Sequence, residues 1–236
     1  MPNEILLILS LIAIYGAVLL SFVLFGEKGL ITWTVLATIA ANIEVLILVK
    51  AFGLVQTLGN VMFASTFLVT DILSEIYGKK QAKQAVNMGI FALVCFLLIS
   101  QLWLFYTPTE GDYVFPSIQG VFENTPRVMI AGLIVYAIVQ RFDVWLYHRL
   151  WQLTEKTSGS RRKALWLRNN LATLTSQLLN TILFTFGAFA GTYSLDELSS
   201  IILTSYLIYF MTALADTPIV YLARRIHEKR KLRRDA

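Results

Sequence analysis

Long apolar runs recur along the whole length of this sequence. A helix needs about 20 mostly apolar residues to cross the hydrocarbon core of a bilayer. Seven segments meet that requirement, and short polar connections separate them. They are Ile5–Phe25, Leu30–Val49, Val55–Tyr77, Ala82–Tyr106, Arg127–Leu150, Asn169–Gly191 and Leu198–Ala223. We therefore predict an all-α, polytopic membrane helix bundle with about seven transmembrane helices.

The composition agrees with a chain dissolved in lipid. Hydrophobic residues make up 56% of the 236 residues and charged residues 15%, whereas soluble domains contain about 45–50% apolar and about 25% charged residues. No polar stretch is long enough to form a separate soluble domain. We predict a single transmembrane domain over residues 1–236 that ends in a basic tail at residues 224–236.

Lysine and arginine gather in a few short segments between the apolar runs. Of the 20 basic residues, seven lie in the 224–236 tail and five in the connection at 151–168. The connections at 107–126 and 192–197 contain acids but neither lysine nor arginine. Because basic connections stay in the cytoplasm, we predict a cytoplasmic C-terminus and an N-terminus outside. This clustering also accounts for the net charge of +5 without a nucleic-acid partner.

The sequence offers no metal or cofactor motif. Its single cysteine, Cys95, lies in an apolar run, and its two histidines, His148 and His227, lie beside basic residues at segment ends. None of them has the spacing of metal ligands. A Walker A motif is also missing from the sequence, so ATP binding by that route is excluded. We expect no metal and no cofactor.

Acidic residues inside apolar segments are the first candidates for a site. A charge at the bilayer centre costs at least about 2.5–3.5 kcal/mol, so such residues face the bundle interior or water. Asp71 and Glu75 lie four residues apart and share one helical face. Like charges at that spacing need a cation, a shared proton or a donor to stabilise them. We favour a functional role for Asp71. For Glu75, a functional role and a structural ion pair with Lys79 fit the sequence equally well.

The segment at 127–150 has its own polar interruption. Gln140 and Asp143 should face the interior, while Arg141 extends toward the cytoplasm. The alternative is a structural ion pair between Arg141 and Asp143. Both interpretations place an acid inside the bundle.

The last two segments add amides and another acid. Thr173, Gln177 and Asn180 share one helical face, which predicts either substrate contacts or polar contacts between helices. Asp216 lies two residues before Pro218, and proline can kink a helix. An acid beside a kink suits a binding site or a gate, and a bond to a neighbouring helix is the alternative.

The strongest candidates lie at one depth. Asp71, Asp143, Gln177 and Asp216 each lie six to nine residues from a basic residue at a segment end, or roughly 9–14 Å at the helical rise. A polar belt at one depth predicts a pocket. The predicted substrate-binding residues are Asp71, Glu75, Gln140, Asp143, Gln177, Asn180 and Asp216. The secondary candidates are Asn42, Glu44, Arg127 and Trp145.

Short motifs in three segments resemble those of a known family. The motifs are Phe67-Leu68-Val69-Thr70-Asp71 followed by Glu75-Ile76-Tyr77-Gly78, then Arg127, Tyr136, Gln140, Asp143-Val144 and Arg149-Leu150, and finally Ser176-Gln177 with Asn180-Thr181 and Phe184. Together they resemble the queuosine precursor transporter family, also called the vitamin uptake transporter family, over roughly residues 40–220.

This resemblance implies a bacterial inner-membrane importer of 7-deazaguanines such as preQ0 and preQ1. It also implies a fold similar to the S components of energy-coupling-factor transporters, with six core helices, so the first segment becomes an extra N-terminal helix. The family commonly has an acid at the position of Asn180, so this chain departs from the pattern there. A carboxylate accepts from the donors of a deazaguanine, an amide serves its carbonyl, and an aromatic residue such as Trp145 could stack on the ring.

Two other functions compete with a stand-alone transporter. An S component would bind the substrate but need a separate energising complex, and the small residues at 37–41 offer a weak docking face. An intramembrane enzyme would need catalytic groups. The sequence has neither an H-E-x-x-H nor a G-x-S-x-G motif. We therefore predict a non-enzymatic transporter whose partners are a small heterocyclic substrate and the lipid bilayer.

Overall fold

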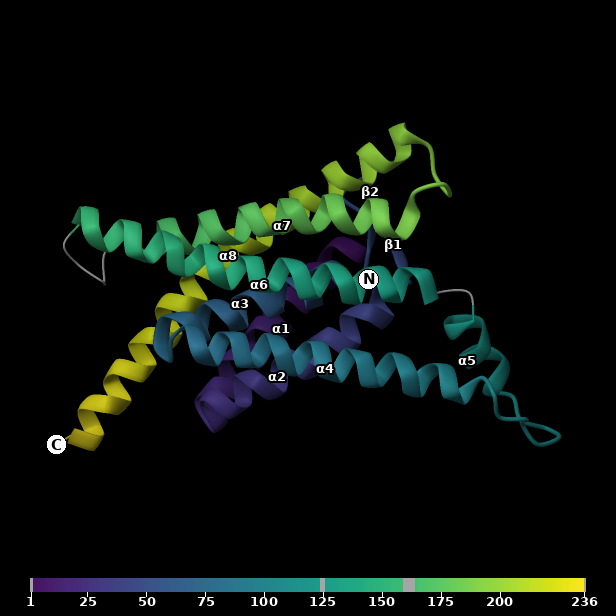
Figure 1. Ribbon diagram of the computed structural model, residues 1–236, viewed down its shortest axis with the longest axis horizontal. Coiled ribbons are helices and arrows are strands. Elements are labelled where there is room, and N and C mark those ends of the chain that lie inside the picture. Colours follow the sequence, from purple (N-terminus) through teal and green to yellow (C-terminus); the bar gives the residue numbers. More distant parts are fainter. Residues whose placement is uncertain (1, 124–125, 159–163, 236) are drawn as a thin grey trace.

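The computed structural model describes residues 2–123, 126–158 and 164–235. Within those residues the chain forms eight helices and one two-stranded hairpin (Figure 1). In chain order these are α1 (Asn3–Phe25), α2 (Glu27–Glu44), β1 (Leu48–Ala51), β2 (Leu54–Thr57), α3 (Gly59–Ile76), α4 (Lys79–Trp103), α5 (Phe115–Phe122), α6 (Pro126–Ser158), α7 (Leu165–Phe189) and α8 (Leu195–Asp235). The predicted all-α bundle is confirmed.

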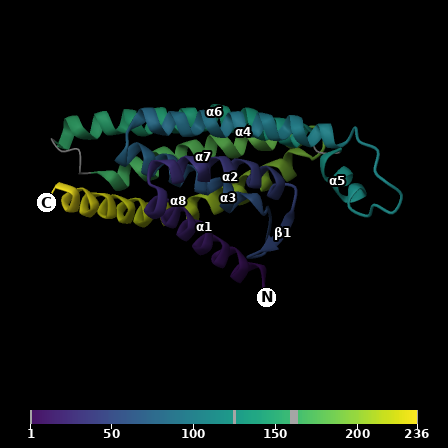
Figure 2. The same cartoon turned by 90° about the horizontal axis from the view of Figure 1, so that it is seen from below.

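The bundle has two distinct ends. The last turns of α8 diverge from the other helices at one end, and α5 projects at the opposite end (Figures 1 and 2). We call these the tail end and the hairpin end, because β1 and β2 lie toward the α5 side (Figure 2). Chain order then places the start of α3 at the hairpin end and its last turn at the tail end.

Helix α3 is the centre of the bundle. It packs against α1, α2, α4, α6 and α8, and every residue from Ala64 to Ser74 is buried. A helix enclosed by other helices needs no lipid-facing apolar stripe, so it can carry more polar residues than its neighbours. This enclosure explains how α3 can carry Thr66, Thr70 and Asp71 in its buried middle.

Within the described residues, five helices are long and apolar enough to cross a membrane: α1, α4, α6, α7 and α8. Helices α2 and α3 contain 18 residues each, so each is about 27 Å long. The structure thus supports a multi-pass membrane protein, and the crossing count of about seven stays a prediction.

The β1–β2 hairpin corrects two predicted spans. Helix α2 ends at Glu44 and α3 begins at Gly59, so the ends of Leu30–Val49 and Val55–Tyr77 are strand. The connecting residues Phe52 and Gly53 both have positive φ, at 52° and 75°, which defines a two-residue turn whose twist suits a hairpin. The N-terminus holds the turn, because the Phe52 N–H donates to Glu4 Oε1 at 3.0 Å and Asn3 Nδ2 donates to the Lys50 carbonyl at 2.8 Å.

Helix also extends into segments outside the predicted spans. The long connection at 107–126 contains the short helix α5, and the 224–236 tail continues α8 as helix through Asp235. Arg168 was expected in the basic connection but lies in the first turn of α7 and is fully buried. Arg161, Arg162 and Lys163 of that connection lie outside the described residues.

Candidate functional site

Three carboxylates from three helices gather inside the bundle. Asp71 comes from α3, Asp143 from α6 and Asp216 from α8, and their residues are 0%, 0% and 1% exposed. Each lies close enough to at least one of the others to influence it electrostatically. The predicted belt at one depth is therefore a true spatial cluster, which we call the carboxylate cluster.

Hydroxyl and amide groups surround the carboxylate cluster. Thr173 Oγ1 on α7 donates to Asp71 Oδ2 at 3.0 Å. Gln140 Nε2 on α6 donates to Thr66 Oγ1 on α3 at 2.6 Å, and Thr70 Oγ1 lies 3.5 Å from Gln140 Oε1. These bonds fix α3 against α6 and α7, so the backbone positions of the acids are well supported.

Much of this polar surface has no hydrogen-bond partner in the described chain. Asp71 Oδ1 and both polar atoms of the Gln177 amide are unpartnered. Both carboxylate oxygens of Asp143 and of Asp216 also have no described partner within 3.5 Å, although the Ser176 hydroxyl lies near Asp143 and the Tyr15 hydroxyl near Asp216. A buried polar atom without a partner costs about 1–3 kcal/mol, and more if it is charged. So many orphan groups at one place are the signature of a site that a polar ligand or water completes.

The cluster also lacks a cationic neighbour among the described residues. Arg141, the alternative partner of Asp143, instead points outward, where its Nη2 donates to Asn87 Oδ1 at 3.2 Å. The ion pairs formed by described residues involve Glu75 and Glu228 and none of the three aspartates. A ligand that brings N–H donors or positive charge would complement the cluster.

A pocket with about 420 Å³ of empty space, its opening included, lies at the hairpin end of the same interior. Its polar lining residues are Asn42, Thr57, Asn60, Asn180 and Tyr209, and Phe63 and Phe184 are its aromatic ones. We call it the hairpin-end pocket. Gln177 lies three residues before Asn180 on α7, so their side chains occupy successive turns of one face. These two amides thus lie in a row that runs from the pocket toward the carboxylate cluster.

Close helix approach shapes this pocket. A Cβ placed on Gly132 of α6 would lie 2.7 Å from Asn42 Oδ1 of α2, and one on Gly59 would lie 2.8 Å from the Ala41 carbonyl oxygen. Only glycine allows these approaches without displacing a neighbour. Asn42 is therefore held against α6, with its Oδ1 unpartnered.

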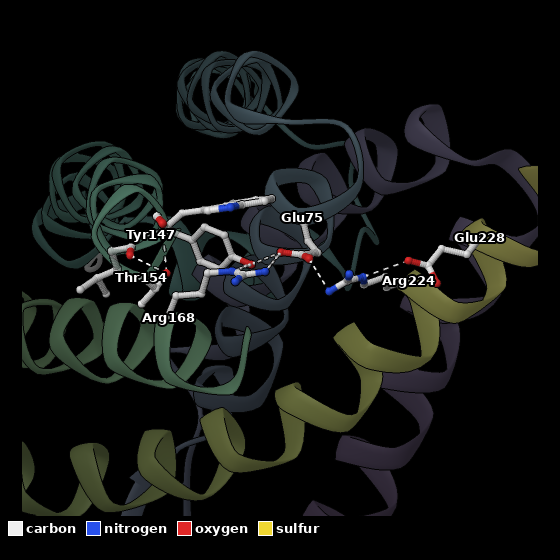
Figure 3. A network of polar contacts seen from close by, with 8 residues as sticks. Glu75, Tyr147, Thr154, Arg168, Arg224 and Glu228 are labelled. Carbon is white, nitrogen blue, oxygen red and sulfur yellow. Dashed lines mark hydrogen bonds and ion pairs between the residues drawn. The ribbon is translucent and has the colours of Figure 1, made fainter. Parts of the chain in front are cut away.

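Glu75 occupies a different environment at the tail end (Figure 3). Its Oε2 accepts from Arg168 Nη2 at 2.5 Å and from the Tyr147 hydroxyl at 2.9 Å, and its Oε1 accepts from Arg224 Nη1 at 3.0 Å. The Arg168 guanidinium also lies 4.4 Å from the centroid of the Trp151 ring. The ion pair considered with Lys79 is replaced by one with Arg168 and Arg224, which we call the Glu75 network.

The secondary candidates lie apart from the carboxylate cluster, although Asn42 lines the pocket. Arg127 donates to the carbonyls of Gly187 and Ala190 at the end of α7. Glu44 is half-buried in the last turn of α2. Trp145 is 50% exposed on α6, so it does not face the interior.

Sequence reasoning missed several lining groups. Asn60 and Tyr209 bond each other at 3.1 Å in the pocket. Asn60 falls just after the unexpected hairpin, and single tyrosines in apolar runs are too common to stand out. Among the described residues, no group of three or more His, Cys, Asp or Glu side chains is arranged to hold a metal ion.

Comparison with known proteins identifies the family. Residues 57–223 match the family described as "Putative vitamin uptake transporter". A protein of Bacillus subtilis (strain 168), described as a "Probable queuosine precursor transporter", is 35% identical over 209 residues, which are 89% of each chain. No solved structure gives a significant match. The chain therefore belongs to the vitamin uptake transporter family, as its motifs in α3, α6 and α7 led us to expect.

Proposed function

We propose that this chain imports queuosine precursors, 7-deazaguanines such as preQ0 and preQ1, across the bacterial inner membrane. The observation that carries the proposal is the set of buried, unpartnered carboxylates and amides in the bundle interior. The similarity to a protein described as a queuosine precursor transporter supports the ligand class. We expect the protein to act as a transporter and not as an enzyme.

The ligand chemistry matches the cluster. A deazaguanine presents ring N–H groups and an exocyclic amine, which carboxylates accept, and a ring carbonyl, which the amide of Gln177 can serve. The aminomethyl group of preQ1 is an ammonium ion at neutral pH, so it would also supply the missing positive charge. We assign Asp71 and Asp143 to the base edge, with Asp216, Gln140, Gln177 and Asn180 completing the site.

The two ends of the bundle suggest a transport direction. We place the hairpin end and the N-terminus outside, and the basic tail in the cytoplasm, because lysine and arginine are retained there. The hairpin-end pocket is then the entrance. The Glu75 network closes the cytoplasmic end in this conformation, so release requires its ion pairs to separate. Reporter fusions to each terminus that are active on only one side of the membrane test this orientation.

The decisive experiment is a queuosine test in cells. Bacteria that can neither make nor import the precursor would express this chain and receive nanomolar preQ0 or preQ1, and their tRNA would be assayed for queuosine. Restored queuosine is the expected result. If queuosine stays absent although the protein is inserted in the membrane, the proposed stand-alone transport is wrong. Co-purification with ATPase subunits would then favour an S component.

A further inference from the structure

A groove on the outer surface of the bundle carries cations that no described acid neutralises. Helices α4 and α6 pack side by side (Figure 2), and exposed basic residues line the space between them. One hollow, with about 640 Å³ of empty space including its opening to solvent, is lined by Lys83, Asn87, Arg141 and Trp145, together with Val86 and Val144. A second, with about 780 Å³ of empty space counted in the same way, includes Lys80, Lys83, Asn87 and Phe91. The two share Lys83 and Asn87, and we call them together the basic groove.

Of the three cations in the basic groove, Arg141 most needs an anionic partner. It lies nine residues before Leu150, the predicted end of its span, or about 14 Å along the helix, so we expect its Cα to lie below the membrane surface. Its side chain is exposed and is tied to α4 by its bond to Asn87 at 3.2 Å. An arginine at that depth needs an anion, water or a path to the interface. The bond to Asn87 directs it into the groove.

Acids are missing from this lining. None of the residues that form either hollow is acidic, and the ion pairs between described residues involve other arginines. Three cations from two helices therefore converge without a counter-charge. Basic residues that only keep a segment in the cytoplasm would not need to converge. They would also not need an amide such as Asn87 to position the deepest cation, Arg141.

The flanks of the basic groove are apolar. Met88 and Phe91 on α4 are 42% and 71% exposed, and Trp145 on α6 is 50% exposed. Met88 and Phe91 follow the cations of α4 toward the bilayer centre, whereas Trp145 follows Arg141 by one turn toward the tail end. A cationic site with an apolar surface beside it matches a phospholipid, which has an anionic headgroup and apolar acyl chains. A soluble phosphate would contact only the cations.

We propose that the basic groove binds an anionic phospholipid of the leaflet at the tail end, with its phosphate held by Lys83 and Arg141 beside Trp145 and its acyl chain lying along Met88 and Phe91. Basic pockets between transmembrane helices recognise lipid headgroups in this way. The site lies on the outer surface, away from the carboxylate cluster, and does not depend on the proposed substrate.

Phosphatidylglycerol is a direct probe. The full-length protein would be taken from nanodiscs containing equal amounts of phosphatidylglycerol and phosphatidylcholine, and its retained lipid counted by native mass spectrometry. We expect wild type to retain phosphatidylglycerol preferentially, and Lys83→Gln/Arg141→Gln to retain about tenfold less of it, because each basic contact contributes appreciably. The matched control, Lys229→Gln/Lys231→Gln, removes two exposed charges from the last turns of α8 and should behave as wild type.

A second double variant distinguishes loss of lipid binding from misfolding. Lys80→Gln/Lys83→Gln changes only exposed residues at the start of α4, and it should also reduce retention severalfold. Quenching of Trp145 fluorescence by brominated phosphatidylglycerol, measured as the difference from Trp145→Phe, should weaken in parallel. Equal retention of the two lipids by wild type, or equal retention of phosphatidylglycerol by the groove and α8 variants, would overturn the proposal.

Discussion

Helix α3 carries two buried acids one turn apart, and they differ in how many of their carboxylate oxygens have a partner. Glu75 has both oxygens engaged by two arginines and a tyrosine. Asp71 has one threonine hydroxyl on one oxygen and no partner on the other, and the neighbouring Asp143 and Asp216 have no partner within 3.5 Å among the described residues, although the hydroxyls of Ser176 and Tyr15 lie near them. Burial is nearly equal, with the Glu75 side chain 3% exposed and the Asp71 residue 0% exposed.

This difference separates structure from function on one helix. A buried charge that is fully paired stabilises one arrangement of the helices that supply its partners. Buried polar groups left without partners are costly, so a chain retains them where a ligand completes them. We therefore expect damage to the Glu75 network to reduce stability, and damage to the carboxylate cluster to reduce transport.

The largest effect should follow from Glu75→Gln. The substitution leaves the fully buried Arg168 without its carboxylate, and breaking a buried ion pair costs about 3–5 kcal/mol. Unfolding in mixed micelles titrated with SDS measures this loss. Glu228→Gln is the matched control, because Glu228 also pairs with Arg224 but its side chain is 45% exposed; it should cost at most about 1 kcal/mol. Equal losses for both variants would refute the comparison.

The next largest effect should be on uptake by Asp143→Asn. The amide keeps the shape but removes the charge, and hydrogen bonds to charged groups contribute about 1.5–3 kcal/mol, so precursor uptake should fall by roughly tenfold or more. Stability should stay equal or rise, because an unpartnered buried charge disappears. The uptake of labelled preQ1 tests the expected loss of transport, and thermal unfolding tests the expected stability. Asp196→Asn, on an exposed residue of the first turn of α8, is the control and should change neither.

Periodicity and composition could predict the bundle and the depth of the cluster. Asp71, Asp143 and Asp216 stand out because each interrupts an apolar run, and helical rise alone places them at one level. Their convergence could not be derived, because it depends on which faces of α3, α6 and α8 meet. The pairing of Glu75 shows the same limit: Lys79 is its neighbour in sequence, but Arg168 and Arg224 are its neighbours in space.

The β1–β2 hairpin marks where the sequence argument fails. Apolar residues flank Gly53 on both sides, and short apolar runs fit a strand as well as the end of a helix. Two apolar spans therefore appeared to continue through residues that form strands. The pocket residue Asn60 follows this hairpin directly, so the error in the fold and the missed site residue have one cause.

A smaller effect should come from crowding the hairpin-end pocket. In Gly132→Ala the added methyl group meets Asn42 Oδ1 at 2.7 Å, so Asn42 must shift, and overpacking of this kind typically costs about 1–3 kcal/mol. Uptake should fall severalfold through weaker precursor binding, which a concentration series would show as a raised KM. Gly120→Ala is the matched control, since a Cβ there meets nothing within 4 Å. An unchanged KM for Gly132→Ala would remove the pocket from the transport path.

The smallest effect should follow from Arg127→Gln, which tests whether a charge near the pocket belongs to it. Arg127 donates to the carbonyls of Gly187 at 3.2 Å and Ala190 at 2.5 Å, and a cation at the end of a helix stabilises it by about 0.3–1 kcal/mol. The exposed Arg127 does not line the hairpin-end pocket. We therefore expect uptake within about twofold of wild type and a slightly lower unfolding temperature, with Arg127→Lys restoring much of the difference through its retained charge. A tenfold loss of uptake at unchanged stability would mean that Arg127 contacts the substrate, and the boundary drawn between supporting and binding residues would have to move outward to include it.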